Sequence, residues 1–396
     1  MVRMGGFSVA RASVFALAAV AIACSKKEAT QGSAAGGTNA RTMKVGLVTD
    51  IGGRGDQSFN DSALRGLELW AGGKKFTGSG YRDETPEELK SSIPSDLSNV
   101  QPPIERLPIE PLVLQSKAQE DYEPNLQLLV EQGVALAIGT GFMLENAVKT
   151  VAKRNSSSQF LLIDSPLLDA QGKPISAPNV RTVIFREEEG SFLVGALAGL
   201  VTKANRVAFV GGMEIPLIKK FEAGFRAGVA TTNADAAQRI LISYTGSFDN
   251  VAIGKQIAQD MLAKGADVVF HAAGSDGLGV IHAVKEARAA GKNAWVIGVD
   301  SDQWPVAPDA VLTSMVKRVD LAVYATVWDL VHGSFQPGNS VLGVKNKGVS
   351  YAEVRVDFPG KAAALQRVEL LRQKIVSGEI KVPSNIAELA SFKVPP

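Results

Sequence analysis

Three aspartates stand where apolar runs of the sequence end. Asp50, Asp164 and Asp300 each follow a short, mostly apolar run that is typical of a buried strand. A carboxylate accepts hydrogen bonds from hydroxyl groups. Phe59 and Phe142 lie in the polar segments after two such runs and offer flat apolar faces. These residue types together suit a solute with both a hydroxylated ring and a planar ring.

The charge of this set narrows the kind of solute further. Lys317, after the run 311–316, is the one cation that we place with the aspartates, where it would offset their charge. A phosphate would favour more Arg or Lys, or a helix N-terminus, so three carboxylates argue against an anion. The sequence therefore favours a neutral solute such as a nucleoside. The predicted ligand-binding residues are Asp50, Ser58, Phe59, Asn60, Gly141, Phe142, Asp164, Met213, Gly274, Asp300 and Lys317.

These residues require a scaffold that brings several strand ends together. Apolar runs predict buried parallel strands at residues 44–49, 135–138, 160–163, 206–210, 267–271 and 295–299. Amphipathic stretches between them predict helices at residues 125–132, 187–201, 219–229, 252–264 and 279–289. Such alternation indicates an α/β protein with doubly wound parallel sheets, in which ligands bind beyond the carboxyl ends of the strands.

The number of predicted strands favours two lobes over one sheet. We expect the chain to cross between lobes near residues 183–186, 314–318 and 347–354. One lobe would then comprise residues 43–184 and about 318–347, and the other residues 185–317 and about 348–396. Residues 72–111 are rich in proline and charge and are predicted to be an insertion, a tolerated surface loop in the favoured interpretation and a lid or docking surface in the alternative. A short helix is expected at residues 85–91.

The N-terminus predicts export and a lipid anchor. Arg3 and Arg11 precede an apolar stretch, residues 12–23, which ends at Cys24, the only cysteine. Small residues before a lone cysteine resemble a lipoprotein signal, so residues 1–23 are predicted to be a signal peptide and Cys24 the lipidated residue. Residues 24–42 are then a flexible tether. A secretory signal with an incidental cysteine is the alternative.

The ordered motifs resemble those of the basic membrane protein family, which are bacterial lipoproteins related to purine nucleoside receptor A. The matching stretches are residues 50–60, 121–126, 139–142, 187–195, 211–216, 221–228, 244–249, 272–274, 298–303 and 313–318. The resemblance implies a two-lobed periplasmic-binding-protein fold of the first type. It also implies service to an ABC importer, with nucleosides as ligands and a purine favoured.

Carried over by position, the resemblance implies that Phe59 stacks on a base while Asp300 and Lys317 hold the sugar. Asp50, Asn60 and Asp164 would line the same lobe as Phe59, and Gly274 would offer backbone from the other lobe. The second wall against the base remains open among Phe192, Met213 and Phe221. Two stretches, residues 54–56 and 275–276, depart from the family pattern and leave the identity of the solute open.

Other classes of function find less support. With 42 basic and 40 acidic residues among 396, no clustered basic surface for nucleic acid is indicated. No metal-ligand spacing, cofactor motif or serine–histidine pair is recognised, so no cofactor, metal or catalytic residue is predicted. We expect a monomer that works with a membrane permease. A ligand-sensing receptor for another hydroxylated solute and a secreted nucleoside-cleaving hydrolase remain the alternatives.

Overall fold

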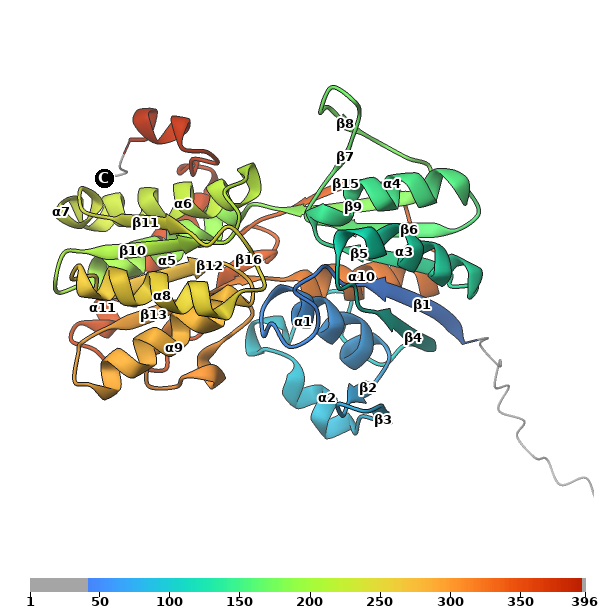
Figure 1. The fold of residues 1–396 in the computed structure, drawn as a ribbon, viewed down its shortest axis with the longest axis horizontal. Coiled ribbons are helices and arrows are strands. Elements are labelled where there is room, and N and C mark those ends of the chain that lie inside the picture. The colour runs from blue at the N-terminus through green and yellow to red at the C-terminus, as the bar shows by residue number, and fades with distance from the viewer. Residues whose placement is uncertain (1–41, 394–396) are drawn as a thin grey trace, which may run out of the picture. The chain divides into compact units, whose positions relative to one another are not determined.

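The structure is a computed structural model that describes residues 42–393 (Figure 1). The predicted signal peptide, Cys24 and the tether as far as residue 41 lie outside the described residues. Within residues 42–393, no helix combines the length and apolar character needed to cross a membrane.

The first sheet is parallel throughout and has six strands (Figure 1). Their order is β15 (Gly338–Leu342), β9 (Val180–Phe185), β6 (Gln159–Ile163), β5 (Leu136–Thr140), β1 (Met43–Val48) and β4 (Ile109–Leu114). The helices that accompany it are α1 (Phe59–Leu64), which continues as the π-helical turn η1 (Arg65–Ala71), α3 (Tyr122–Glu131), α4 (Glu145–Arg154) and α10 (Val319–Val331). We call this sheet and its helices the first lobe.

The second sheet also has six strands, and only its last edge strand runs antiparallel. Their order is β11 (Leu241–Tyr244), β10 (Val207–Gly211), β12 (Val268–Ala272), β13 (Trp295–Asp300), β14 (Val311–Lys317) and β16 (Val349–Tyr351). Its helices are α5 (Glu187–Val201), α6 (Pro216–Thr232), α7 (Ala234–Ala237), α8 (Val251–Ala263), α9 (Asp276–Ala289) and α11 (Lys361–Ser377). This sheet and its helices form the second lobe, so the predicted α/β class with two doubly wound sheets is confirmed.

The central strands are buried on both faces, which explains their unbroken apolar sequences. In β6, Phe160 and Leu162 pack with α3 and α4, whereas Leu161 and Ile163 face the opposite core. Because successive side chains of a strand point to opposite faces, one short apolar run can serve two helix layers. The core that contains Leu161 continues into the second lobe.

The chain passes between the two sheets three times. The passages lie between β9 and α5, between β14 and α10, and between β15 and β16. They are linked to one another, since Arg186 N donates to Leu342 O at 2.8 Å and Arg318 N donates to Gly348 O at 2.9 Å. We call residues 186, 318 and 343–348 the crossovers, and we propose them as the boundaries of the two lobes.

The predicted insertion, residues 72–111, is wrong at its C-terminal end because residues 109–111 begin β4. The pattern was obscured by Pro111, which an edge strand tolerates because β4 has a neighbour on one side only. Residues 72–108, the insertion segment from here on, are folded. They contain β2 (Lys74–Phe76), β3 (Tyr81–Asp83), α2 (Pro86–Ser92) and η2 (Ser95–Leu97).

A local sequence signal explains where one short helix begins. The expected short helix is α2, whose N-cap Thr85 and residue Glu88 form a reciprocal capping box. Short elements complete the described chain: η3 (Gln119–Asp121), η4 (Phe142–Leu144), β7 (Leu167–Leu168), β8 (Pro174–Ile175), η5 (Trp304–Val306) and η6 (Ala387–Ser391).

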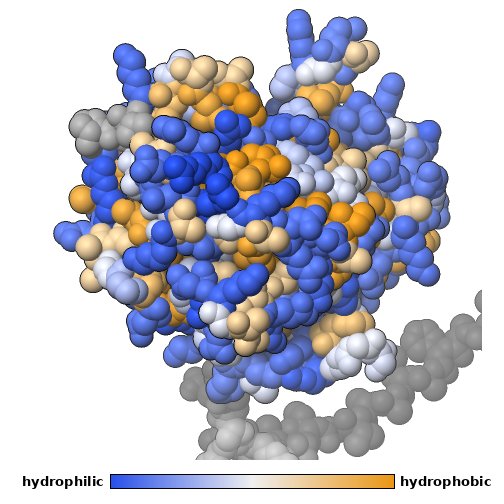
Figure 2. All heavy atoms as spheres, turned by 60° about the vertical axis from the view of Figure 1, so that its left-hand side comes forward, coloured by the Kyte–Doolittle hydropathy of each residue, from blue (hydrophilic) through white to orange (hydrophobic). Residues whose placement is uncertain are grey.

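Figure 2 shows one face of the molecule, where the surface is mostly hydrophilic and apolar side chains form small groups.

Candidate functional site

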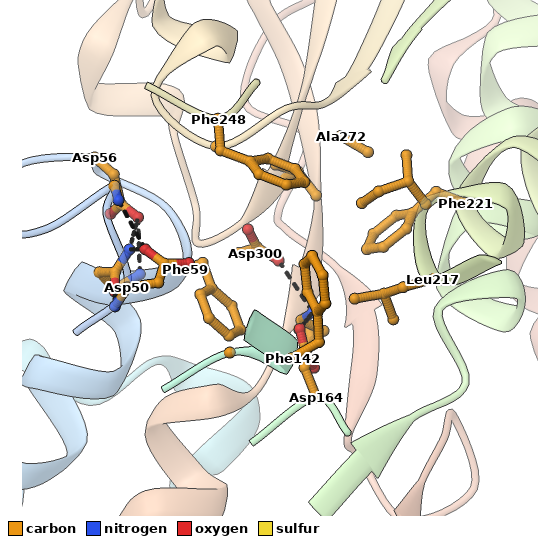
Figure 3. Close-up of a pocket in the computed structure, with 17 residues that line it drawn as sticks. Asp50, Asp56, Phe59, Phe142, Asp164, Leu217, Phe221, Phe248, Ala272 and Asp300 are labelled. Carbon is orange, nitrogen blue, oxygen red and sulfur yellow. Dashed lines mark hydrogen bonds and ion pairs between the residues drawn. The ribbon is translucent and has the colours of Figure 1, made fainter. Parts of the chain in front are cut away.

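A cavity lies where strand ends of both lobes meet (Figure 3). Its empty volume is about 540 Å³, including the part that is open to solvent. Side chains of both lobes line it. The lining residues are Asp50, Gly52, Asp56, Phe59, Asn60, Gly141, Phe142, Asp164, Leu217, Ile218, Phe221, Phe248, Ala272, Gly274, Val299, Asp300 and Lys317.

Asp50, which follows β1 and lines the cavity, is held by a local network that uses one of its two carboxylate oxygens. Its Oδ1 accepts hydrogen bonds from Asn60 Nδ2 at 2.7 Å and from Gly52 N at 2.9 Å. Asn60 Oδ1 in turn accepts from Asp50 N at 3.2 Å, and Asn60 Nδ2 also donates to Asp56 at 3.1 Å. The Asn60 amide thus orients Asp50. Burial raises the pKa of Asp50 to about 6, although the hydrogen bonds from Asn60 and Gly52 oppose this shift.

Gly141 packs its backbone against Asp50 and Phe59 in the cavity wall. Gly141 has φ of +111°, a backbone conformation that is strained for residues with a side chain. A Cβ there would also lie 3.3 Å from Asp50 Oδ2 and 3.4 Å from Phe59 Cε1. The backbone of residue 141 therefore forms part of the cavity wall, against both the carboxylate and the phenyl ring.

Lys317, the last residue of β14, joins the carboxylates of both lobes. Its Nζ lies 2.6 Å from Asp164 Oδ2, 3.7 Å from Glu187 Oε1 and 3.9 Å from Asp300 Oδ1. The Lys317 side chain is 3% exposed. Burial opposes its charge, yet the surrounding carboxylates dominate and raise the pKa of Lys317 above its usual value. Burial raises the pKa of Asp300 and of Glu187, an effect that Lys317 opposes.

Two of these aspartates adopt an unusual backbone conformation. Asp164 has φ of +70° and Asp300 has φ of +63°, in the left-handed region that non-glycine residues seldom enter. Each stands at the end of a central strand, in different lobes. Such local strain persists where the surrounding structure holds it, and it is frequent at ligand sites.

The acidic groups around Lys317 have hydrogen-bonding capacity to spare. Asp164 Oδ1 and Glu187 Oε1 are buried and accept no hydrogen bond from the described residues. Because buried polar atoms are ordinarily paired, these oxygens favour a partner that supplies hydrogen-bond donors. Asp164 lines the cavity, so a hydroxylated solute there could supply them.

Aromatic and aliphatic side chains form the remaining walls (Figure 3). Phe59 and Phe221 lie on opposite sides of the view, and Lys317 Nζ is 4.8 Å from the centre of the Phe59 ring and 5.5 Å from that of Phe221. Phe142 of the first lobe meets Phe248 of the second edge to face, with ring centres 6.4 Å apart. A planar group in this cavity would contact aromatic rings from both lobes.

Hydrogen bonds hold the β1–α1 segment against the end of β13. Ser58 Oγ donates to Asp300 Oδ2 at 2.6 Å, and Ser301 Oγ donates to Ser58 O at 3.1 Å. Gln303 Nε2 donates to Gln57 O at 3.1 Å. The structure therefore shows the two lobes in contact at the cavity. There Asp300 accepts a hydrogen bond from Ser58 of the first lobe and lies 3.9 Å from Lys317 Nζ of its own lobe.

The structure brings most of the predicted site residues together. Those that line the cavity are Asp50, Phe59, Asn60, Gly141, Phe142, Asp164, Gly274, Asp300 and Lys317. Ser58 does not line the cavity but donates a hydrogen bond to Asp300, which does. Met213 does not line it, and Phe192 is a fully buried core residue, so Phe221 is the one of the three candidate wall residues that faces the cavity.

Several lining residues escaped the sequence-based prediction. Phe248 lies in a loop between β11 and α8, inside a stretch that carried the family resemblance, 244–249, but its ring alone did not distinguish it from core. Leu217 and Ile218 belong to the first turn of α6 and look like ordinary helix residues. Among residues 42–393, no cluster of His, Cys, Asp and Glu fits a metal ion.

Two sheets whose strand ends face one cavity define a periplasmic-binding-protein type of solute-binding protein. Solved structures agree. A solute-binding protein of an ABC transporter system from Aeropyrum pernix K1 is 28% identical, with a TM-score of 0.70 over 88% of this chain and 96% of that one. One from Conexibacter woesei has a TM-score of 0.61 at 20% identity, covers 87% and 99%, and supports the fold alone.

The chain belongs to the family of PnrA-like ABC transporter substrate-binding proteins, whose model matches residues 43–386. The ABC transporter nucleoside-binding protein BmpA of Lactococcus lactis is 32% identical and covers 94% of this chain and 97% of that protein. The CD4+ T-cell-stimulating antigen of Listeria monocytogenes is 34% identical and covers 87% and 89%. Basic membrane protein A of Borreliella burgdorferi is 31% identical over 91% and 93%.

Proposed function

We propose that this protein captures a nucleoside, with a purine favoured, in the cavity between its lobes and delivers it to an ABC importer. The observation that carries the proposal is the position of Lys317, paired with Asp164 and Asp300 beside the Phe59 ring. One side of this arrangement offers carboxylates for hydroxyl groups, and the other offers a flat apolar face. The name of the BmpA relative, a nucleoside-binding protein, supports the same class of ligand.

In the proposed complex, the sugar lies against the charged cluster and the base lies among the phenyl rings. Asp300, Asp164 and Lys317 would exchange hydrogen bonds with the ribose hydroxyls, while Phe59 and Phe221 would cover the base. Asp50 Oδ2 would accept a hydrogen bond from the edge of the base. Because these groups come from both lobes, a bound solute joins them and favours the closed arrangement.

Nucleotides should bind far more weakly than nucleosides. Among the described residues that line the cavity, Lys317 is the one cation, and it is already surrounded by carboxylates. A phosphate would bring negative charge next to Asp164 and Asp300 without a free basic partner. The proposed ligand is therefore uncharged.

We also propose where the protein works and with which partners. The predicted lipidation of Cys24 would hold it at the membrane surface, facing the periplasm or the exterior, with a permease in the same membrane. Cys24 lies outside the described residues, so this proposal depends on the sequence pattern and on membership of the importer family. We propose that the protein acts as a monomer.

The proposal is tested by identifying what the protein binds. The purified protein should release a nucleoside on denaturation, detected by mass spectrometry, and calorimetry should then give saturable binding of inosine, guanosine or adenosine but not of their 5′-phosphates. No binding of any nucleoside would contradict the proposal. Release of free base on incubation would instead support the nucleoside-cleaving alternative.

A further inference from the structure

The insertion segment, residues 72–108, contacts two of the crossovers and the segment that carries cavity residues. Its helix η2 is anchored in the protein interior, because Leu97 is 1% exposed and belongs to the large hydrophobic core. The neighbouring residue Asp96 points to the crossovers. Its carboxylate accepts two hydrogen bonds from Arg318 Nη2, at 2.6 and 2.7 Å, and its carbonyl accepts one from Lys347 Nζ at 3.1 Å.

These two partners belong to different crossovers. Arg318 directly follows Lys317 and precedes α10, whereas Lys347 lies in the crossover between β15 and β16 and has φ of +60°. The two crossovers also share a backbone hydrogen bond, from Arg318 N to Gly348 O. One residue of the insertion segment thus joins two of the three passages between the lobes.

A chain of charges continues from Asp96 to the lobe contact. Arg318 Nη1 lies 3.8 Å from Asp320 Oδ2, and the same oxygen lies 2.7 Å from Arg65 Nη2. Arg65 in turn donates to Ser301 Oγ of the second lobe at 3.3 Å. Asp320 is 1% exposed at its side chain, so solvent screens this network little.

The insertion segment has a second attachment, at the β1–α1 segment that carries the cavity residues. Arg54 pairs with Glu68 in bidentate fashion, at 2.7 and 2.9 Å, and its guanidinium stacks 4.1 Å over the ring of Phe76 in β2. The Tyr81 hydroxyl of β3 donates to Glu68 as well. The departure of residues 54–56 from the family pattern therefore coincides with a contact to the insertion segment.

We propose that Asp96 is a positioning residue for lobe closure. It holds two crossovers in the geometry that places Lys317 beside Asp164. The insertion segment is then a brace on the hinge. The proposal rests on the proposed function in that closure retains a bound solute. Loss of the brace loosens the crossovers, so a bound solute escapes faster while its entry is little changed.

The test compares Asp96→Ala with Asp83→Ala in the whole mature protein. Asp83 is the matched control because it pairs with Lys74 and Arg106 and contacts no crossover. Asp96→Ala removes the two hydrogen bonds from Arg318 and keeps the carbonyl that accepts from Lys347 Nζ. Hydrogen exchange by mass spectrometry should therefore be at least about threefold faster over residues 317–321 in Asp96→Ala, and unchanged in Asp83→Ala. Equal protection of these residues in Asp96→Ala and the wild type would overturn the proposal.

The second readout is kinetic and uses inosine as the probe. Asp96→Ala should release inosine roughly three- to fivefold faster, as expected for loss of a charge pair whose carboxylate partner is 47% exposed. Lys347→Ala should show the same direction more weakly. A lowered midpoint with an unchanged release rate would mean a purely structural role and would overturn the proposal. If the wild type binds no nucleoside, the proposed function fails. The hydrogen-exchange comparison still shows whether Asp96 holds the crossovers.

Discussion

Lys317 Nζ lies 2.6 Å from Asp164 Oδ2, so the last residue of β14 in one lobe is ion-paired with the residue that follows β6 in the other. Both side chains are almost fully buried, at 3% and 5% exposure. A pair of this kind stabilises the contact between the lobes only as long as both partners are present, since either charge alone would be buried without compensation.

Replacing Lys317 by Met should therefore affect both binding and stability. The change leaves Asp164, Asp300 and Glu187 without their shared cation, and removal of one partner of a buried pair costs about 3 kcal/mol of unfolding free energy. Nucleoside affinity should fall roughly ten- to 100-fold with the lost charged hydrogen bonds. Calorimetry and denaturant unfolding measure the two effects. The control is Lys153→Met on an exposed position of α4, which should alter neither. Wild-type affinity in Lys317→Met would place the ligand elsewhere.

The Asp50 carboxyl makes the stability of the protein depend on pH, and the sign of this dependence follows from its pKa. Burial raises the pKa of Asp50 from 3.8 to about 6, so the folded protein binds a proton that the unfolded chain has released. This group's contribution to stability is complete below pH 4 and is lost as the pH rises through 6. Asp50→Asn removes the buried charge, while its amide oxygen can still accept from Asn60 and Gly52.

Asp50→Asn should thus be more stable than the wild type at pH 7.5, by at most about 3 kcal/mol, and the difference should vanish near pH 4. Urea unfolding at several pH values tests this difference. The same variant should lose nucleoside affinity, because the ionised oxygen that accepts from the ligand is gone. A stability difference that is independent of pH would show that the Asp50 carboxyl does not titrate as described.

Ser58→Ala removes a hydrogen bond between the lobes at the cavity. Ser58 Oγ donates to Asp300 Oδ2 at 2.6 Å, and its loss leaves that carboxylate with fewer donors in the closed arrangement. We expect roughly tenfold weaker nucleoside binding and a more open average conformation by small-angle scattering in the presence of ligand. Ser91→Ala, at an exposed position of α2, is the control. An effect of equal size in both variants would rule out a specific role for Ser58.

Phe59→Leu separates stacking from simple burial. Leucine keeps an apolar side chain at this position but loses the aromatic face, so unfolding free energy should change little. Affinity for nucleosides should fall roughly three- to tenfold, the range expected for the loss of a ring-on-ring preference. Isothermal calorimetry provides the measurement. Unchanged affinity would mean that the base does not lie on this ring.

The fold class was predictable because buried parallel strands leave a strong trace in the sequence. β10 is an unbroken apolar run, Val207–Gly211, since both of its faces are covered. Edge strands leave a weaker trace. β15, Gly338–Leu342, is polar and partly exposed, and β4 contains Pro111, so neither was recognised.

The site was partly predictable for a related reason. Residues directly after a strand, such as Asp50 and Asp300, are placed by the sheet itself, which fixes where each strand ends. Phe248 is placed by a loop and by its contact with Phe142, which no local pattern encodes. The contact of Asp96 with Arg318 joins residues that are 222 positions apart, and only the folded arrangement of the crossovers brings them together.

The central claim is that carboxylates on either side of Lys317 bind the hydroxyl groups of a sugar while phenyl rings cover its base. Calorimetry with inosine and with 2′,3′-dideoxyinosine tests it most directly, because the two compounds share a base and differ in the diol. The account predicts saturable binding of inosine and at least about 100-fold weaker binding of the dideoxy compound, as expected when buried polar groups lose their partners. Equal affinity for the two compounds would contradict it.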